Sequence, residues 1–244
     1  VQAQQSGRVV IIRDAEIERL VRDYARPILK AAGQNPNTEI VLVNDPSFNA
    51  FVSGRRIFIN TGALMRAEIP GEIIGVIAHE AGHLAGGHQF RLRERAETAE
   101  KLAVLSTVLG LGVTVAGAAA KNGDIARAGS GIAVGGAEAA RRSLLSYQRG
   151  EETTADRSAI TYLDKTGQSA AGLLATFQRF ADALSLTGSR VDPYRISHPM
   201  PLDRIANLQT LAMASPNFDK MDPPALQVRH DMARAKIAAY TIGG

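Results

Sequence analysis

The chain contains no cysteine and no tryptophan among its 244 residues, and aromatic residues make up only 5% of it. Without cysteine it can form neither a disulfide framework nor a thiolate metal site, so any metal ligands must be histidines and carboxylates. The net charge is +4, but the basic residues are scattered in short pairs such as Arg55-Arg56. Because aromatic platforms and base-reading motifs are also missing, we expect a solvated basic surface and no nucleic-acid partner.

The stretch His79-Glu80-Ala81-Gly82-His83 matches the pattern His-Glu-x-x-His. The apolar residues around it predict a buried helix, on which two histidines four residues apart share one face and can hold one metal ion. Glu80 lies about 100° around the helix axis from His79, where its carboxylate can take a proton from metal-bound water. The alternative is a chance match, but polar side chains in so apolar a helix need partners. We expect His88, about 180° from His79, to be a structural or surface residue, because it cannot join the same metal unless the helix breaks at Gly86-Gly87.

A catalytic zinc usually has three protein ligands, so a further ligand must come from elsewhere in the chain. Glu152 and Asp156 are four residues apart and share a face if their segment is helical. One carboxylate could bind the metal while the other accepts the free ring N–H of a ligand histidine. Spacing alone leaves open a second interpretation, a solvated acidic start of a helix.

The two segments together resemble the gluzincin pattern, in which His-Glu-x-x-His is followed at a distance by Glu-x-x-x-Asp. Their residues are similar to the metallopeptidase family of HtpX-like, Oma-like and CAAX-prenyl-protease-like enzymes, and most closely to its periplasmic BepA-like members. The resemblance implies that Glu152, which stands four residues before Asp156, is the third zinc ligand, and that Glu151 is not.

A third segment, Ser197-His198-Pro199, followed by Arg204, resembles the downstream His-Pro stretch of the same family. A loop histidine near the zinc could stabilise the oxyanion. In BepA-like members the matching histidine can instead occupy the open zinc position and hold the enzyme shut. We expect Arg204 to contact the same site. The alternative is that His198 only precedes a helix and has no catalytic role.

The remaining pattern predicts a helix from 14 to 32 capped by Asp14, a strand at 39–43, a hairpin of 50–52 with 56–60, and a helix over 201–213. In gluzincins an edge strand before the zinc helix aligns the substrate by strand addition, and the hairpin resembles that element. A plain core hairpin fits these residues equally well.

Residues 102–120 carry no charge and, at about 19 residues, are just long enough to span a bilayer. This segment and the following one at 128–137 are rich in small residues, which let two helices approach closely. Because the second stretch is short and leucine is sparse, we favour a helical hairpin insertion at about 102–140. We expect it to pack on the catalytic domain with peripheral membrane contact rather than to form a true span.

The two ends of the chain suggest processing and continuation. The chain opens at Val1 with no methionine and no charged-then-apolar leader, so we expect that a signal peptide has already been removed. We divide the chain into a catalytic domain at 1–222 and a C-terminal helix at 223–244, which resembles the first element of a tetratricopeptide-repeat domain. We expect His230, on that helix, to lie at the surface.

We therefore predict an α+β, mainly helical zincin-like metalloprotease domain with a small β-sheet, holding one Zn²⁺ per chain through His79, His83 and Glu152. Glu80 is the expected general base, while Asp156 orients a ligand imidazole. The resemblance implies a periplasmic endopeptidase acting on misfolded or unassembled envelope proteins. Two rivals are a chaperone-like zinc protein for outer-membrane protein assembly and a membrane-embedded processing protease.

Overall fold

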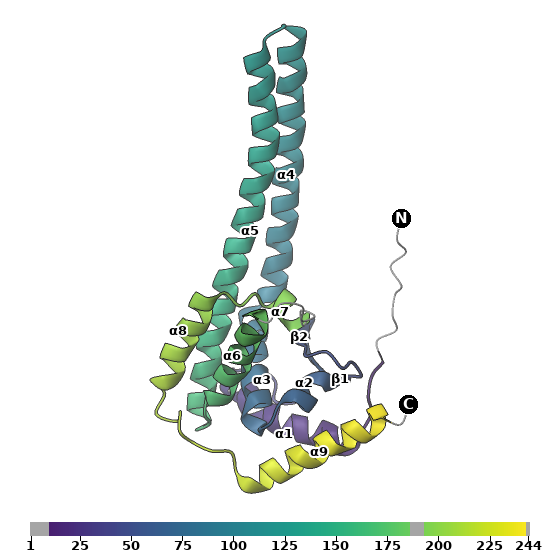
Figure 1. Cartoon of the computed structure of the whole chain (residues 1–244), viewed down its shortest axis with the longest axis vertical. Coiled ribbons are helices and arrows are strands. Elements are labelled where there is room, and N and C mark those ends of the chain that lie inside the picture. Colours follow the sequence, from purple (N-terminus) through teal and green to yellow (C-terminus); the bar gives the residue numbers. More distant parts are fainter. Residues whose placement is uncertain (1–9, 186–192, 243–244) are drawn as a thin grey trace. The chain divides into compact units, whose positions relative to one another are not determined.

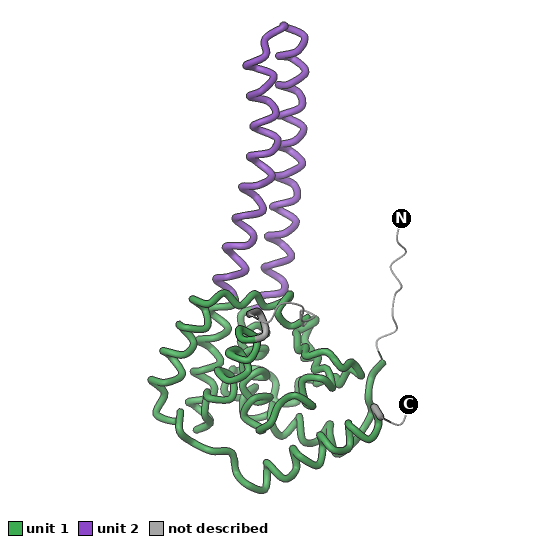
Figure 2. Tube along the Cα trace, viewed as in Figure 1, with its two compact units in different colours: residues 1–86, 152–244 green, residues 87–151 purple. Residues whose placement is uncertain are grey.

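The computed structural model describes residues 10–185 and 193–242 and divides into two compact units. Unit 2 comprises Gly87–Glu151, and the remaining described residues belong to unit 1 (Figure 2). One long helix, α5 (Gly123–Lys165), contributes its first part to unit 2 and its part from Glu152 onward to unit 1. The predicted mainly helical α+β class is confirmed.

Unit 1 contains a three-stranded sheet built from β1 (Ile40–Val43), β2 (Ala50–Ser53) and β3 (Arg56–Asn60). The strand order is β1-β3-β2, with β1 parallel and β2 antiparallel to the central β3. Gly54 has a φ of 62° in the turn between β2 and β3, a left-handed conformation that favours glycine. The predicted strand and hairpin are therefore confirmed, and β2 is an edge strand.

The helices of unit 1 are labelled in Figure 1. Asp14 caps α1 as predicted, because its Oδ1 accepts hydrogen bonds from the backbone N–H groups of Glu16 and Ile17 at 3.0 and 3.1 Å. The helices are α1 (Ala15–Ala31), α2 (Thr61–Arg66), α3 (Pro70–Gly86), α6 (Ala171–Ser185), α7 (Pro193–Ser197), α8 (Leu202–Met213) and α9 (Pro224–Ile242).

Helix α3 runs through the core of unit 1. It packs against α1, α6, β2 and α9, and every residue from Pro70 to His83 is buried. Its apolar side chains, such as Val76 and Ile77, lose all contact with solvent. This burial supplies most of the free energy that holds α3 in the core. The same packing forces His79 and Glu80, also 0% exposed, into an apolar interior where they require partners.

Helix α9 packs against α1, α2 and α3, and the expectation of a surface His230 is wrong. His230 is fully buried: its Nδ1 lies 2.9 Å from the Tyr24 hydroxyl and its Nε2 2.9 Å from the Ala67 carbonyl oxygen. A neutral ring with its proton on Nε2 satisfies both contacts. The imidazole thus joins three helical segments of unit 1.

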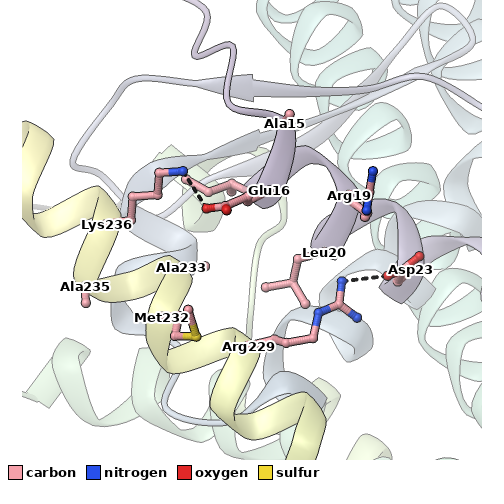
Figure 3. Close-up of a pocket in the computed structure, with 11 residues that line it drawn as sticks. Ala15, Glu16, Arg19, Leu20, Asp23, Arg229, Met232, Ala233, Ala235 and Lys236 are labelled. Atoms are coloured by element: carbon pink, nitrogen blue, oxygen red, sulfur yellow. Dashed lines mark hydrogen bonds and ion pairs between the residues drawn. The ribbon is translucent and has the colours of Figure 1, made fainter.

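A groove of about 850 Å³ lies between α1 and α9 (Figure 3). Ion pairs cross it, with Asp23 to Arg229 at 2.7 Å and Glu16 to Lys236 at 2.7 Å. These pairs are partly exposed and each contributes little, so the buried contacts of His230 and its apolar neighbours hold α9 in place.

Unit 2 is a pair of helices, α4 (His88–Ala119) and the first part of α5. Gly87, with a φ of 62°, separates α4 from α3. The unit extends beyond both ends of the predicted 102–140 insertion, because the charged segments that flank the apolar stretch are helical as well.

Replacing His230 with alanine should lower the free energy of unfolding by about 2–4 kcal/mol, because it leaves two buried polar groups unpaired and opens a cavity. Urea denaturation measures this. Met232→Ala, on the same helix but 66% exposed, is the matched control and should change stability by less than about 0.5 kcal/mol. Equal effects of the two variants would contradict the assigned role of His230.

Burial lowers the pKa of His230 from its ordinary value of 6.5. As the pH falls, the His230 side chain is therefore protonated in the unfolded chain at a higher pH than in the folded chain. The stability that neutral His230 provides is lost as the pH falls below about 6.5. We expect the stability advantage of wild type over His230→Gln, which does not titrate, to shrink between about pH 7.5 and 5.5. An advantage independent of pH would count against a neutral buried imidazole.

Candidate metal centre

Four side chains from three parts of unit 1 meet in its interior. His79 and His83 come from α3, Glu152 from α5, and His198 from the residue that follows α7. All four are buried, and one potential ligand atom from each lies within 4.8 Å of the others. The structure therefore brings together the predicted metal ligands and the predicted loop histidine.

The two helical histidines face one another as their spacing requires. His79 Nε2 lies 2.9 Å from His83 Nε2. The two carboxylate oxygens of Glu152 lie 3.3 Å from His79 Nε2 and 3.5 Å from His83 Nε2. Two imidazole nitrogens and one carboxylate thus converge on a single point, which is the donor set expected of a zincin.

His198 is the fourth member of the cluster. Its Nδ1 lies 3.1 Å from Glu152 Oε2 and 3.4 Å from His79 Nε2, while its Nε2 lies 3.4 Å from Glu80 Oε1. Its backbone N–H donates to the Tyr194 carbonyl at 2.8 Å. In this conformation His198 faces both the ligands and the expected general base.

The close approach of α3 and α5 allows Glu152 to reach the histidines. A Cβ atom on Gly82 would lie 3.0 Å from the backbone of Ala155. A side chain at position 82 would therefore push the two helices apart. Gly82, the fourth residue of the His-Glu-x-x-His stretch, has a packing role that its spacing alone does not reveal.

Asp156 and Arg204 form a second layer behind His79. The His79 Nδ1 lies 2.9 Å from Asp156 Oδ1. Arg204 donates to both oxygens of the same carboxylate, at 2.7 and 2.8 Å, and its Nη1 lies 3.0 Å from Glu152 Oε2. Asp156 holds the ring proton on Nδ1, so Nε2 is the nitrogen that His79 turns to the cluster and could offer to a metal ion once its own proton is lost.

Two aromatic residues at the site escaped sequence reasoning. The Phe177 ring, on α6, packs edge-on against His79 at 5.8 Å and lies 4.9 Å from the Arg204 guanidinium carbon. The Tyr194 ring lies 4.5 Å from that of His198. Tyr194 stands four residues before His198, so helical spacing could have indicated it, but nothing in the sequence marks Phe177.

Burial and hydrogen bonding separate the pKa values of the two helical histidines. Burial disfavours the charged form of His79, but hydrogen bonds to Asp156 and Glu152 outweigh it and raise the pKa of His79 to about 9. Burial lowers the pKa of His83 to about 3. The His83 ring is therefore neutral at physiological pH and could donate a lone pair to a metal ion.

The pKa values of the buried carboxyl groups of Glu80 and Glu152 also shift in opposite directions. Burial raises the pKa of Glu80, which has no strong hydrogen-bond donor. Burial also opposes ionisation of Glu152, but His198, His79 and His83 hold its pKa well below the ordinary value. Two carboxyl groups in one cavity thus have different proton affinities, the arrangement that divides acid–base work from ligation.

The residues present fit a divalent metal ion. Neither oxygen of the buried Glu80 carboxylate has a hydrogen-bond partner among the described residues. Three buried carboxylates (Glu80, Glu152 and Asp156) face one buried guanidinium, Arg204, so the site is short of positive charge. The raised pKa of His79 is a response to that shortage, and a divalent cation would remove it.

His88 lies outside this cluster. The helix does break at Gly87, but His88 belongs to unit 2, where its Nε2 lies 2.8 Å from Glu151 Oε2. Glu151 also contacts Arg91 at 3.1 Å. The structure therefore places Glu151 and His88 in a separate ion-pair group, in agreement with a structural role for His88.

Comparison with known proteins points to one family. The family model described as Peptidase family M48 matches residues 12–212. A Vibrio cholerae protein provisionally named a beta-barrel assembly-enhancing protease is 28% identical over 96% of the chain, and the Escherichia coli K12 beta-barrel assembly-enhancing protease is 25% identical over 98%. The chain spans 46% of the length of each. Metalloprotease YcaL of Escherichia coli K12 is 29% identical over 75% of the chain and 66% of its own length.

Replacing Asp156 with asparagine should weaken Zn²⁺ binding by about 10–100-fold, because the His79 ring loses the carboxylate that orients it. Competition with a chromophoric chelator measures the affinity. Asp203→Asn changes an exposed carboxylate at the start of α8 and should leave binding unchanged. Unaltered affinity in Asp156→Asn would contradict the orienting role.

Proposed function

Because the chain belongs to Peptidase family M48, whose model matches most of its length, we propose that it is a zinc-dependent metalloendopeptidase. The observation that carries this proposal is the buried cluster of His79, His83, Glu152 and His198, with the unpartnered Glu80 carboxylate beside it. Such a donor set suits zinc, which prefers tetrahedral nitrogen and oxygen ligands and whose catalytic sites use three protein ligands.

His79, His83 and Glu152 would hold the zinc ion. When bound, zinc supplies a Lewis acid that polarises the scissile carbonyl and lowers the pKa of water. Asp156 and Arg204 orient His79 for metal binding. Asp156 holds the Nδ1 proton of His79, and Arg204 fixes Asp156 through two hydrogen bonds. Arg204 thus fixes Asp156, and Asp156 in turn fixes the imidazole of His79.

Glu80 is the general base in this proposal. Burial raises the pKa of its carboxyl group, so its carboxylate accepts a proton more readily than an exposed glutamate would. It takes a proton from the attacking water and later delivers it to the leaving amine. Its position one residue after His79 places it beside the ligands without joining their set.

His198 occupies the remaining side of the cluster, and we interpret this conformation as a closed state. Its Nδ1 lies among the other ligand atoms, so a substrate carbonyl and His198 would compete for the same position. Once displaced, the same ring could stabilise the oxyanion. The chain is thus inhibited by its own residue until something moves His198 away.

The substrates we propose are polypeptides, misfolded or unassembled proteins of a bacterial envelope, met in the periplasm. The support is that two relatives are named for enhancing beta-barrel assembly. The strand β2, which leads directly into the turn at Gly54, lies at the edge of the three-stranded sheet, where an extended segment of such a substrate could add as a further strand.

Glu80→Gln should reduce casein cleavage by about 10²–10⁴-fold while zinc stays bound, because glutamine keeps the shape of glutamate but cannot accept the proton. Zinc content is measured on the same samples. Glu94→Gln, in the charged part of α4, serves as the matched control and should cleave as wild type does. Normal cleavage by Glu80→Gln would overturn the assignment of the base.

His198→Ala distinguishes the two roles of this histidine. If His198 closes the site, its removal should raise the rate of casein cleavage several-fold with zinc retained. A fall in rate similar to that of Glu80→Gln would show that His198 acts in the transition state instead. Should wild type and His198→Ala both be inert with zinc bound, the peptidase proposal itself would fail, in favour of a chaperone-like zinc protein.

A further inference from the structure

The two helices of unit 2 pack against each other through small residues. A Cβ atom on Gly110 would collide with the Gly129 carbonyl oxygen, one on Gly117 with the Ala126 nitrogen, and one on Gly136 with the Ser106 hydroxyl. The helix backbones therefore touch directly. A pair that meets this closely leaves no room for large apolar side chains in its interior.

The large apolar side chains of α4 point outward instead. Between 102 and 120, seven of them are more than half exposed: Leu102, Val104, Leu105, Val108, Leu109, Leu111 and Val115. At 100° per residue they cover roughly half of the helix circumference, opposite the glycine contacts. In a water-soluble helix pair, large apolar residues lie at the interface between the two helices. In unit 2 they lie on the outer surface, and small residues form the interface.

Polar groups within this apolar stretch are satisfied locally. The hydroxyls of Ser106, Thr107 and Thr114 donate to the carbonyls four residues earlier at 2.6, 2.8 and 2.8 Å. The helical backbone satisfies its own hydrogen bonds as well. Unit 2 therefore presents few unpaired donors or acceptors along 102–120, as an apolar solvent requires.

The charges of unit 2 bracket the apolar stretch. Residues 102–120 carry none, while Lys101 precedes and Lys121 follows them. The stretch would be about 28 Å long, close to the thickness of bilayer hydrocarbon. Among the described helices, α4 is the one whose length and hydropathy suffice to cross a membrane. Only 11% of its most apolar window is buried within the protein.

The first part of α5 also has a charge-free stretch with exposed apolar side chains, but this stretch is shorter than that of α4. Its exposed side chains include Ile132 and Val134, and 128–137 is free of charge. At the start of this stretch Arg127 pairs with Asp124 at 2.6 Å, and at its end Glu138 pairs with neighbouring arginines. Paired charges cost less at a membrane boundary than isolated ones.

We propose that this helical hairpin, α4 with the first part of α5, inserts tip first into the hydrocarbon of a lipid bilayer and anchors the chain there. A protein partner would need one apolar stripe, whereas the apolar surface here surrounds half of α4 over a bilayer thickness. The inference concerns unit 2 and does not depend on the peptidase proposal.

Liposome flotation of the whole chain tests the anchor. Wild type should float with vesicles of phosphatidylethanolamine and phosphatidylglycerol, and also with phosphatidylcholine vesicles in high salt, because hydrophobic insertion is not screened. The double variant Leu105→Glu with Leu109→Lys keeps the net charge and adds a helix-favouring pair four residues apart. It should stay folded in water and bind vesicles at least about tenfold less.

Val228→Glu changes an exposed apolar residue of α9, in unit 1, and is the matched control that should float as wild type does. Flotation abolished by salt, or restricted to anionic vesicles, would show surface electrostatics alone and overturn the proposal. So would a lipid-free dimer that the double variant dissociates, because the apolar face would then belong to a second copy.

The absence of tryptophan permits a direct measurement of depth. Leu109→Trp places the sole indole of the chain in the middle of the stretch, and Val228→Trp places it on α9. With vesicles whose acyl chains carry bromine, the indole at position 109 should be quenched and blue-shifted, and that at position 228 should not. Equal responses at both positions, or no quenching at 109, would contradict insertion.

Discussion

Burial of charge inside the apolar core around α3 is the constraint on which the rest of unit 1 depends. Glu80, Glu152, Asp156 and Arg204 are each at most 5% exposed, and an unpaired charge in such a place costs several kcal/mol. The other features of the site follow as compensation. Arg204 binds two carboxylates, Asp156 binds an imidazole, and the remaining deficit of positive charge is the reason that the cluster can hold a cation.

The two ring nitrogens of His79 have different partners. One ring nitrogen is occupied by Asp156, so the other is free for the cluster. The same low-polarity surroundings that make charges costly also raise the proton affinity of Glu80, neither of whose carboxylate oxygens has a hydrogen-bond partner among the described residues. In the proposed mechanism, the surroundings of Glu80 and Glu152, rather than their chemical type, would divide proton transfer from metal ligation.

Local spacing made much of the site predictable. His79 and His83, like Glu152 and Asp156, are four residues apart, and helical geometry places each pair on one face. The Arg204–Asp156 pair joins positions 48 residues apart, and the resemblance suggested contact with the site but not its two-point geometry. Phe177 could not be predicted, because only tertiary packing brings α6 against His79.

The strands and the cap at Asp14 were predictable for the same local reason, whereas the surroundings of His230 were not. Its burial depends on Tyr24 and Ala67, which lie far away in the sequence. Unit 2 is longer than the predicted insertion at about 102–140, because charged residues mark the end of an apolar stretch but do not end a helix.

X-ray absorption at the zinc K edge tests the central claim, that the buried histidines and a buried carboxylate bind one divalent metal ion. The account predicts one zinc per chain in a shell of nitrogen and oxygen only, at about 2.0–2.1 Å, with imidazole scattering that weakens in His83→Ala. A protein purified without chelators that holds no metal, or a zinc shell unchanged by loss of His83, would contradict it.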